Sequence, residues 1–206
     1  MKKFLSRYFE YILIAATIAL LFMRSRMPLF GERVSMLMFG TLSFYYLASA
    51  VLVFLDKQRI GRIMRLMYLF GLWSVSISVI GIMMRSLLMQ HDKELLVICV
   101  SSGIGILVYI WLSSRRVAPE NKEQYAYYVK PLIARNAIAL ILSLGFLVGS
   151  NYGIYSMFGT HKFDPVYTEK VVNAYEHADD TSIVNDFKRY DASLNDSTGV
   201  ENRNAQ

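Results

Sequence analysis

Charge is scarce in this chain. Lys, Arg, Asp and Glu make up 18% of its 206 residues, against about a quarter in soluble domains. Hydrophobic residues make up 54%, and this balance favours an integral membrane protein over a soluble one. The pI is near 9.4, but the basic residues form short clusters between apolar runs. Membrane topology explains such clusters, so we predict no nucleic-acid partner.

Cysteine is almost absent. Cys99 is the single cysteine, which excludes an intrachain disulfide. It lies in an apolar run, where a thiolate is disfavoured. We therefore interpret Cys99 as a small buried thiol and not as a nucleophile.

Motifs of enzyme chemistry are also missing. The sequence contains no GxSxG, no HExxH and no phosphate-binding loop, and Gly103-Ile104-Gly105 lacks the third glycine of a dinucleotide site. Histidines and acidic residues near the carboxy terminus have a spacing that matches no compact metal motif. These residues are His161, Asp164, His177 and Asp180. We predict no catalytic site, no bound metal and no cofactor.

Apolar runs of membrane-spanning length recur along the chain, since a spanning helix needs about 20 apolar residues. The first run is followed by Arg24-Ser25-Arg26 and not by a small-residue cleavage site, so we predict an uncleaved span. The predicted spans are residues 4–23, 34–55, 66–84, 95–112 and 133–158. The predicted fold class is therefore all-α, with a polytopic bundle at 1–158 and a helical tail at 159–206.

Lys and Arg are distributed unequally between the two sides of this bundle. The amino terminus and the loops after spans two and four hold 12 of them, and the other side, counted to Lys170, holds 7. The positive-inside rule then places the amino terminus in the cytoplasm and the tail outside it. A bacterial inner membrane is the expected location.

The loop between spans two and three has three arginines at every third residue. They are Arg59, Arg62 and Arg65. On a short interfacial helix they would share one side, which favours contact with anionic lipid headgroups. A surface for a protein partner is the alternative.

Small residues repeat at helical spacing in two spans. In the fifth they are Gly145, Gly149 and Gly153, and in the third they are Gly71, Ser74, Ser78 and Gly81. Such GxxxG-like strips let two helices approach closely within a membrane. The spacing leaves open whether these strips pack inside the bundle or against another subunit.

Few ionisable or polar groups fall within the spans. Glu10 is predicted to pair with Arg7, three residues before it, and Arg135 is placed at the cytoplasmic edge of the fifth span. Four polar groups could line a cavity for a small molecule or lipid, although helix packing and interfacial anchoring are the commoner explanation. They are Tyr45, Tyr46, Asn151 and Tyr155.

The tail is acidic and carries two amphipathic patterns. Asp164-Pro165 predicts the start of one helix, and the segment 179–182 predicts a break and a second start. The two apolar faces must lie on the membrane, on each other or on a partner. From Asn195 the apolar pattern fades, and we expect a mobile end.

Three functions follow from these patterns, in decreasing order of support. The first is a non-enzymatic membrane subunit or scaffold that packs through its small-residue helix faces and docks a protein partner, or a second copy, with its tail. The second is a transporter or lipid-handling component with a cavity between helices. The third is an intramembrane enzyme built around Arg85, His91 and the tail.

Overall fold

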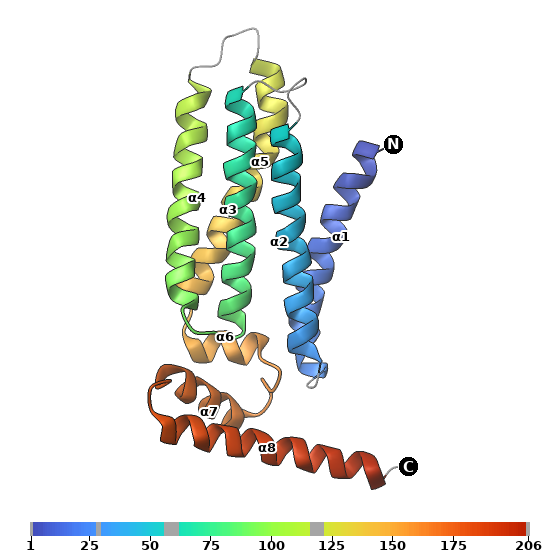
Figure 1. Cartoon of the computed structure of the whole chain (residues 1–206), viewed down its shortest axis with the longest axis vertical. Coiled ribbons are helices and arrows are strands. Elements are labelled where there is room, and N and C mark those ends of the chain that lie inside the picture. Colours follow the sequence, from blue (N-terminus) through green and yellow to red (C-terminus); the bar gives the residue numbers. More distant parts are fainter. Residues whose placement is uncertain (1, 28–29, 56–61, 116–121, 205–206) are drawn as a thin grey trace.

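The computed structural model describes residues 2–27, 30–55, 62–115 and 122–204, with the backbone alone at 2–7, 122–124 and 195–204. All regular structure in these ranges is helical, which confirms the all-α prediction (Figure 1). The elements are α1 (Lys2–Met23), the 3₁₀ helix η1 (Arg24–Arg26), α2 (Gly31–Leu55), α3 (Arg62–Ser86), α4 (Asp92–Ser114), α5 (Lys122–Val148), α6 (Asn151–Phe158), α7 (Pro165–Glu176) and α8 (Thr181–Asn204).

Five segments are long and apolar enough to cross a membrane, as a polytopic membrane protein requires. They are Tyr8–Arg26, Gly31–Leu55, Arg62–Ser86, Asp92–Ser114 and Tyr125–Val148. The first four overlap the predicted spans and differ from them by a few residues at their ends. The fifth begins earlier than predicted and ends ten residues sooner, at Val148.

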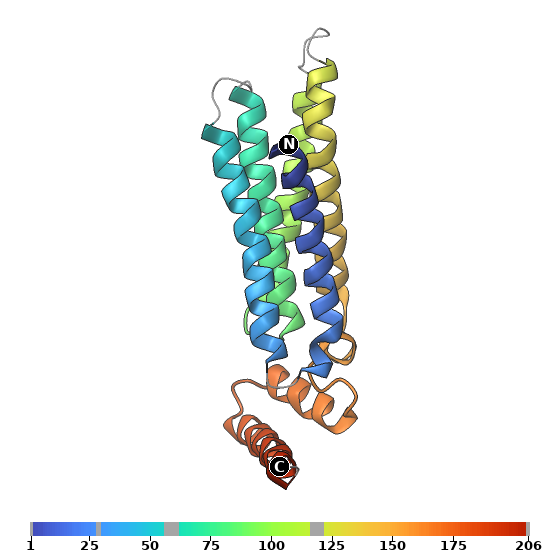
Figure 2. The same ribbon diagram turned by 90° about the vertical axis from the view of Figure 1, so that its right-hand side faces the viewer.

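The five spans run alternately up and down. The start of α1, the end of α2 and the start of α3 lie toward one end of the bundle, which we call the amino-terminal end (Figure 1). Turns joining α1 to α2 and α3 to α4 lie at the opposite end, where α6, α7 and α8 cross the bundle (Figures 1 and 2). We call this the tail end.

Helix α3 is the central helix, in contact with α2, α4 and α5. Two of its glycines permit close approach. A Cβ atom added to Gly71 would lie 2.9 Å from Cδ1 of Leu132 in α5, and one added to Gly81 would lie 2.9 Å from Sγ of Cys99 in α4. The third span therefore presents glycines to two neighbours inside the bundle.

Serine pairs fasten α3 to its neighbours by hydrogen bonds. Ser43 and Ser76 lie with their hydroxyl oxygens 2.7 Å apart, and each hydroxyl is also bonded to the other residue's backbone carbonyl. On the α4 side, the hydroxyls of Ser74 and Ser102 lie 3.1 Å apart. Ser78, in the same strip as Ser74, is buried. Directional bonds of this kind matter in a membrane, where helices gain no hydrophobic driving force from contact with each other.

The predicted glycine strip on the fifth span is not continuous, because the helix breaks. Ser150 is the N-cap of α6, and its hydroxyl accepts a hydrogen bond from the backbone N–H of Gly153 at 3.0 Å. In an unbroken helix this N–H would bond to the carbonyl of Gly149. Gly145, Gly149 and Gly153 therefore do not share one helix face. Gly145 is exposed on α5, with open space where a Cβ would be.

The tail helices start at the capping residues indicated by the sequence. The Asp164 side chain accepts from the N–H groups of Val166 and Tyr167, and Asp180 accepts from the N–H of Ser182. The two helices pack on each other, with Val172 of α7 against Phe187 and Leu194 of α8 in one apolar cluster. We call α7 and α8 the tail hairpin. The backbone of α8 stays helical to Asn204, and the mobility expected from Asn195 stays a prediction.

The central role of α3 predicts unequal effects of two glycine substitutions. Gly71→Ile should lower the free energy of unfolding by about 1–3 kcal/mol, because the new side chain overpacks the contact with Leu132. Gly40→Ile is the matched control, since Gly40 lies mid-helix with nothing within 4 Å of an added Cβ. Thermal unfolding of both variants in the same detergent measures the difference. Equal stabilities would contradict the packing assigned to Gly71.

Candidate functional site

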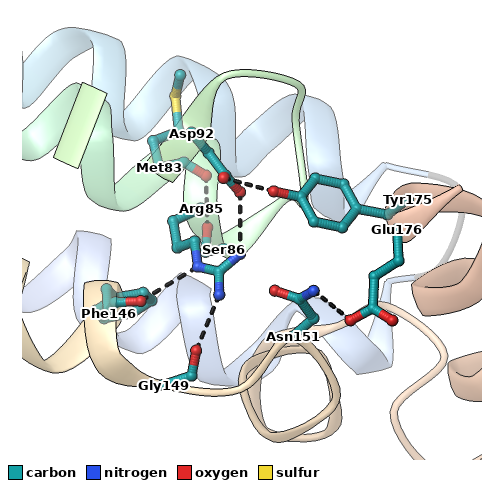
Figure 3. Close-up of polar contacts among 9 residues, drawn as sticks. All are labelled: Met83, Arg85, Ser86, Asp92, Phe146, Gly149, Asn151, Tyr175 and Glu176. Atoms are coloured by element: carbon teal, nitrogen blue, oxygen red, sulfur yellow. Dashed lines mark hydrogen bonds and ion pairs between the residues drawn. The ribbon is translucent and has the colours of Figure 1, made fainter. Parts of the chain in front are cut away.

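The side chain of Arg85 completes the end of α5. Because α5 ends at Val148, the last carbonyl groups have no partners within the helix. Arg85 donates from Nε to the carbonyl of Phe146 at 3.2 Å and from Nη2 to that of Gly149 at 2.9 Å (Figure 3). A cation here is also favoured by the helix dipole. Arg85 thus reaches from the end of α3 and caps α5.

The charge of Arg85 is balanced by Asp92, the first residue of α4. Nη1 of Arg85 lies 3.4 Å from Oδ2 of Asp92, and both side chains are fully buried. Burying two charges costs several kcal/mol per ion unless the pair is also hydrogen-bonded on its remaining sides. The backbone carbonyls satisfy Arg85, so Asp92 needs a further donor.

Tyr175 of α7 is that donor. Its hydroxyl donates to Oδ1 of Asp92 at 2.6 Å (Figure 3). We call Arg85, Asp92 and Tyr175 the tail latch. It joins α3, α4 and α5 of the bundle to the tail hairpin through groups that are charged or bonded to a charge. Such hydrogen bonds are the stronger ones, at about 1.5–3 kcal/mol net.

An apolar cluster supports the tail latch. Leu88, in the turn between α3 and α4, is buried against the tail with Tyr155, Tyr167 and Val172. Leu88 has a φ of 49°, which is costly for a residue with a side chain. Burial of its side chain against the tail offsets that cost. The turn that carries Asp92 and the tail hairpin therefore hold each other in place.

Two of the sequence-predicted cavity residues lie beside the latch. Asn151 is the first residue of α6, and its Nδ2 donates to Oε1 of Glu176 at 2.5 Å (Figure 3). Tyr155 is buried, with its hydroxyl 3.4 Å from Oγ1 of Thr160, and burial raises the pKa of Tyr155. Asn151 thus joins α6 to α7, and Tyr155 packs in the same apolar cluster as Leu88.

A second polar cluster lies far from the first. Glu10 of α1 accepts from Nε of Arg135 at 2.6 Å, from a second guanidinium nitrogen of Arg135, and from the hydroxyl of Tyr46 at 3.0 Å. The Glu10 side chain is 6% exposed. We call Glu10, Arg135 and Tyr46 the midspan cluster. It joins α1 to α2 and α5.

The midspan cluster gives Glu10 a partner that its sequence neighbours did not indicate. Glu10 pairs with Arg135, and the predicted pairing with Arg7 lies outside the described side chains. Arg135 lies ten residues after Tyr125, the first residue of the fifth apolar segment, and its place at the cytoplasmic edge of the membrane stays a prediction.

The four predicted cavity residues do not converge on one place. Tyr46 belongs to the midspan cluster, and the ring of Tyr45 lies 5.6 Å from that of Tyr46. Asn151 and Tyr155 lie at the tail end. Tyr46 is 15 residues beyond Gly31, the tail-end start of α2, which places it about 22 Å from that end.

The predicted headgroup arginines are only partly described. Arg59 lies outside the described residues. Arg62 is exposed at the start of α3, and Arg65 is partly buried, donating to the carbonyl of Phe54 at 3.3 Å with its guanidinium 6.0 Å from the Phe54 ring centre. Arg65 thus has a structural contact within the bundle in addition to any contact with lipid.

The histidines and acidic residues considered for a metal have local roles. Asp164 and Asp180 cap the two tail helices. The ring of His161 lies 4.3 Å from that of Tyr167, and Nδ1 of His177 lies 3.1 Å from the carbonyl oxygen of Asn173. The structure does not gather these four side chains around one point.

Sequence reasoning missed the partners of the buried charges. Arg85 was considered only with His91 and the tail in the enzyme hypothesis, and Glu10 only as a local partner of Arg7. A usable signal was present, because a few ionisable residues of opposite sign lie in or beside long apolar runs. Such residues are rare within membranes and mark functional sites by default.

No protein-family model, curated protein or solved structure matches the chain.

The tail latch predicts a distinctive response to alkali. Burial, reinforced by the hydrogen bond to Asp92, raises the pKa of Tyr175 to about 12. The neutral phenol donates this bond, so its stabilisation is complete below the ordinary tyrosine pKa of about 10 and is lost as the pH rises through about 12. Burial also raises the pKa of Tyr155 and Tyr167, so ultraviolet titration of tyrosinate should show a group of late phenols that is smaller by one in Tyr175→Phe. A late group of unchanged size in Tyr175→Phe would contradict the assignment.

Proposed function

We propose that this protein is a non-enzymatic subunit of a membrane complex that holds its tail hairpin in a fixed position for a partner protein. The observation that carries the proposal is the tail latch. Apolar residues of similar volume often stabilise a fold as well as a buried ion pair does. What the ion pair adds is a defined geometry. Arg85 and Asp92 have all their polar partners only when α4, α5 and α7 come together beside the end of α3.

The surface of the hairpin is suited to a protein partner. Apolar residues of α7 and α8 share one cluster, and α8 exposes charged groups. Among them, Lys188 and Arg189 are exposed, while Asp186 pairs with Lys170 of α7 at 2.5 Å. A partner would therefore meet a polar, preformed surface, and little ordering entropy would be lost on binding.

A second contact with the complex is supported by Gly145. It lies on the exposed side of α5 with Ile138, Ile141 and Leu142. No atom of the bundle lies within 4 Å of a Cβ added at Gly145, so the bundle itself does not require a glycine there. A small residue on such a face allows another helix to approach closely. We infer that this face packs against a spanning helix of the partner.

The charge distribution supports an orientation. The helix ends that the basic loops connect lie at the amino-terminal end (Figure 1), which the positive-inside rule places in the cytoplasm. The tail hairpin would then face the extracytoplasmic side, and a bacterial inner membrane is the membrane we propose. Protease protection of a tag after residue 206 in intact spheroplasts tests the orientation.

Photo-crosslinking in native membranes tests the complex. A photoreactive amino acid at Arg189 or at Gly145 should give adducts with the same protein, identified by mass spectrometry. The exposed position Gly40 on α2 is the control and should give no such adduct. Absence of protein adducts at both Arg189 and Gly145 would overturn the proposal.

A bulky residue at Gly145 should separate assembly from stability. Gly145→Ile should reduce co-purification of the partner while leaving the thermal stability of the isolated protein unchanged, since nothing lies within 4 Å of the added Cβ. Gly40→Ile should change neither property. A loss of stability without loss of assembly would contradict the external role of Gly145.

A second candidate function, an ion- or proton-coupled transporter, is favoured by the midspan cluster alone. A carboxylate paired with an arginine between membrane-spanning helices is typical of transport pathways. If this is its role, proteoliposomes should show proton or cation flux that Glu10→Gln abolishes. Wild-type proteoliposomes without flux would leave the cluster with only its structural role of holding α1.

A further inference from the structure

Exposed apolar side chains in the tail are confined to one region. Among the described side chains from Asn151 to Leu194, the large exposed hydrophobic residues are Tyr152, Met157, Phe163 and Val166. All four lie on α6, on the first turn of α7 or on the connection between them. The described side chains of α8 include no exposed large hydrophobic residue. The tail therefore has an apolar region next to the spans and a polar one on α8.

The connection between α6 and α7 is a built turn that directs Phe163 outward. The backbone N–H of Asp164 donates to the carbonyl of His161 at 3.0 Å. Thr160 is buried beside Tyr155, and the His161 ring lies against Tyr167. Phe163, between these anchored residues, is 81% exposed. A phenylalanine left in water forgoes the free energy that burial of its side chain would provide.

Phe158 makes this turn continuous with the lipid-facing surface of the bundle. Its ring centre lies 5.5 Å from that of Phe22 and 5.4 Å from that of Phe146. Phe22 belongs to the membrane-spanning segment Tyr8–Arg26 and is itself half-exposed. Met157, the next residue to Phe158 in the sequence, is exposed.

We propose that Met157, Phe163 and Val166 form an interfacial anchor that inserts into the boundary between lipid headgroups and acyl chains. The occupant is the bilayer, because the patch is continuous with a surface that already faces lipid. Lys162 has the chemistry expected at this depth: its Nζ lies 5.3 Å from the Phe163 ring centre and donates to the carbonyl of Met157 at 3.3 Å. A lysine beside an aromatic ring suits the headgroup region.

The anchor assigns a height to the tail hairpin. α7 begins next to it at Pro165, and α8 returns across the end of the bundle on the side away from α6 (Figure 1). The start of α7 lies at the membrane surface in this arrangement. Helix α8 lies farther from the bilayer than α7, with its charged side in water. The tail latch fixes the hairpin to the bundle, and the anchor fixes the same hairpin to the lipid.

Spin-label accessibility in vesicles of phosphatidylethanolamine and phosphatidylglycerol tests the anchor. A nitroxide at Phe163→Cys should collide more often with oxygen, which concentrates in lipid, than with a water-soluble nickel complex. The matched control is Asn185→Cys, an exposed position of α8, where the order should reverse. Val166→Cys should follow Phe163→Cys. The native Cys99 is buried. The wild-type protein, treated with the same spin label, measures how much of the label reacts with Cys99.

Two results would overturn the anchor. A label at Phe163 as accessible to the nickel complex as the one at Asn185 would place the turn in water. A label at Phe163 shielded from both reagents would show that protein, and not lipid, covers it. Circular dichroism and thermal unfolding of the three labelled variants confirm that each is folded, so that neither result reflects a misfolded tail.

Discussion

The capping of α5 by Arg85 is the interaction on which the tail end of the molecule depends. The break at Gly149 frees carbonyl groups that the arginine takes up, and without the break those carbonyls would be bonded within the helix. The arginine in turn needs Asp92, because an unpaired buried charge would be strongly destabilising. Asp92 then presents its second oxygen to Tyr175. Helix break, buried charge and tail position are consequences of one set of hydrogen bonds.

The central helices and the peripheral parts of the chain are held by different means. Around α3, glycines and serines allow close packing, and hydroxyl groups bond across the contacts. Of the peripheral parts, α1 is joined to the bundle by the ion pair of Glu10 with Arg135, and the tail hairpin is joined by the hydrogen bond from Tyr175 to the buried carboxylate of Asp92. Lipid gives helices little reason to associate by hydrophobic contact. Directional, charge-assisted bonds therefore supply the specificity that keeps peripheral helices in one place.

Sequence patterns predicted the parts of the fold that depend on local chemistry. The length of the apolar runs indicated five spans, and Asp164 and Asp180 indicated the starts of the tail helices. The end of α5 was missed because Ser150, a favourable N-cap, lies in an apolar stretch that reads as a continuous helix. Its effect depends on Arg85, which is 64 residues from Gly149 in the sequence.

Long-range pairing was beyond the reach of sequence spacing. Glu10 and Arg135 are 125 residues apart, and only the assembled bundle shows that they lie at one depth. The predicted glycine strip illustrates the same limit. Its three glycines are regularly spaced in the sequence, but each has a different environment in the structure. Gly145 faces outward, whereas Gly149 gives its carbonyl to Arg85 and Gly153 gives its N–H to Ser150.

Pulsed electron paramagnetic resonance on the reconstituted protein measures the fixed position of the tail most directly. Spin labels at Lys93→Cys, an exposed position at the start of α4, and at Asn185→Cys on α8 report the distance between bundle and hairpin. The account predicts one narrow distance distribution, which broadens in Tyr175→Phe and more so in Asp92→Asn, and which Tyr152→Phe leaves unchanged. A distribution that is already broad in the wild type, or that stays narrow in both latch variants, would contradict it.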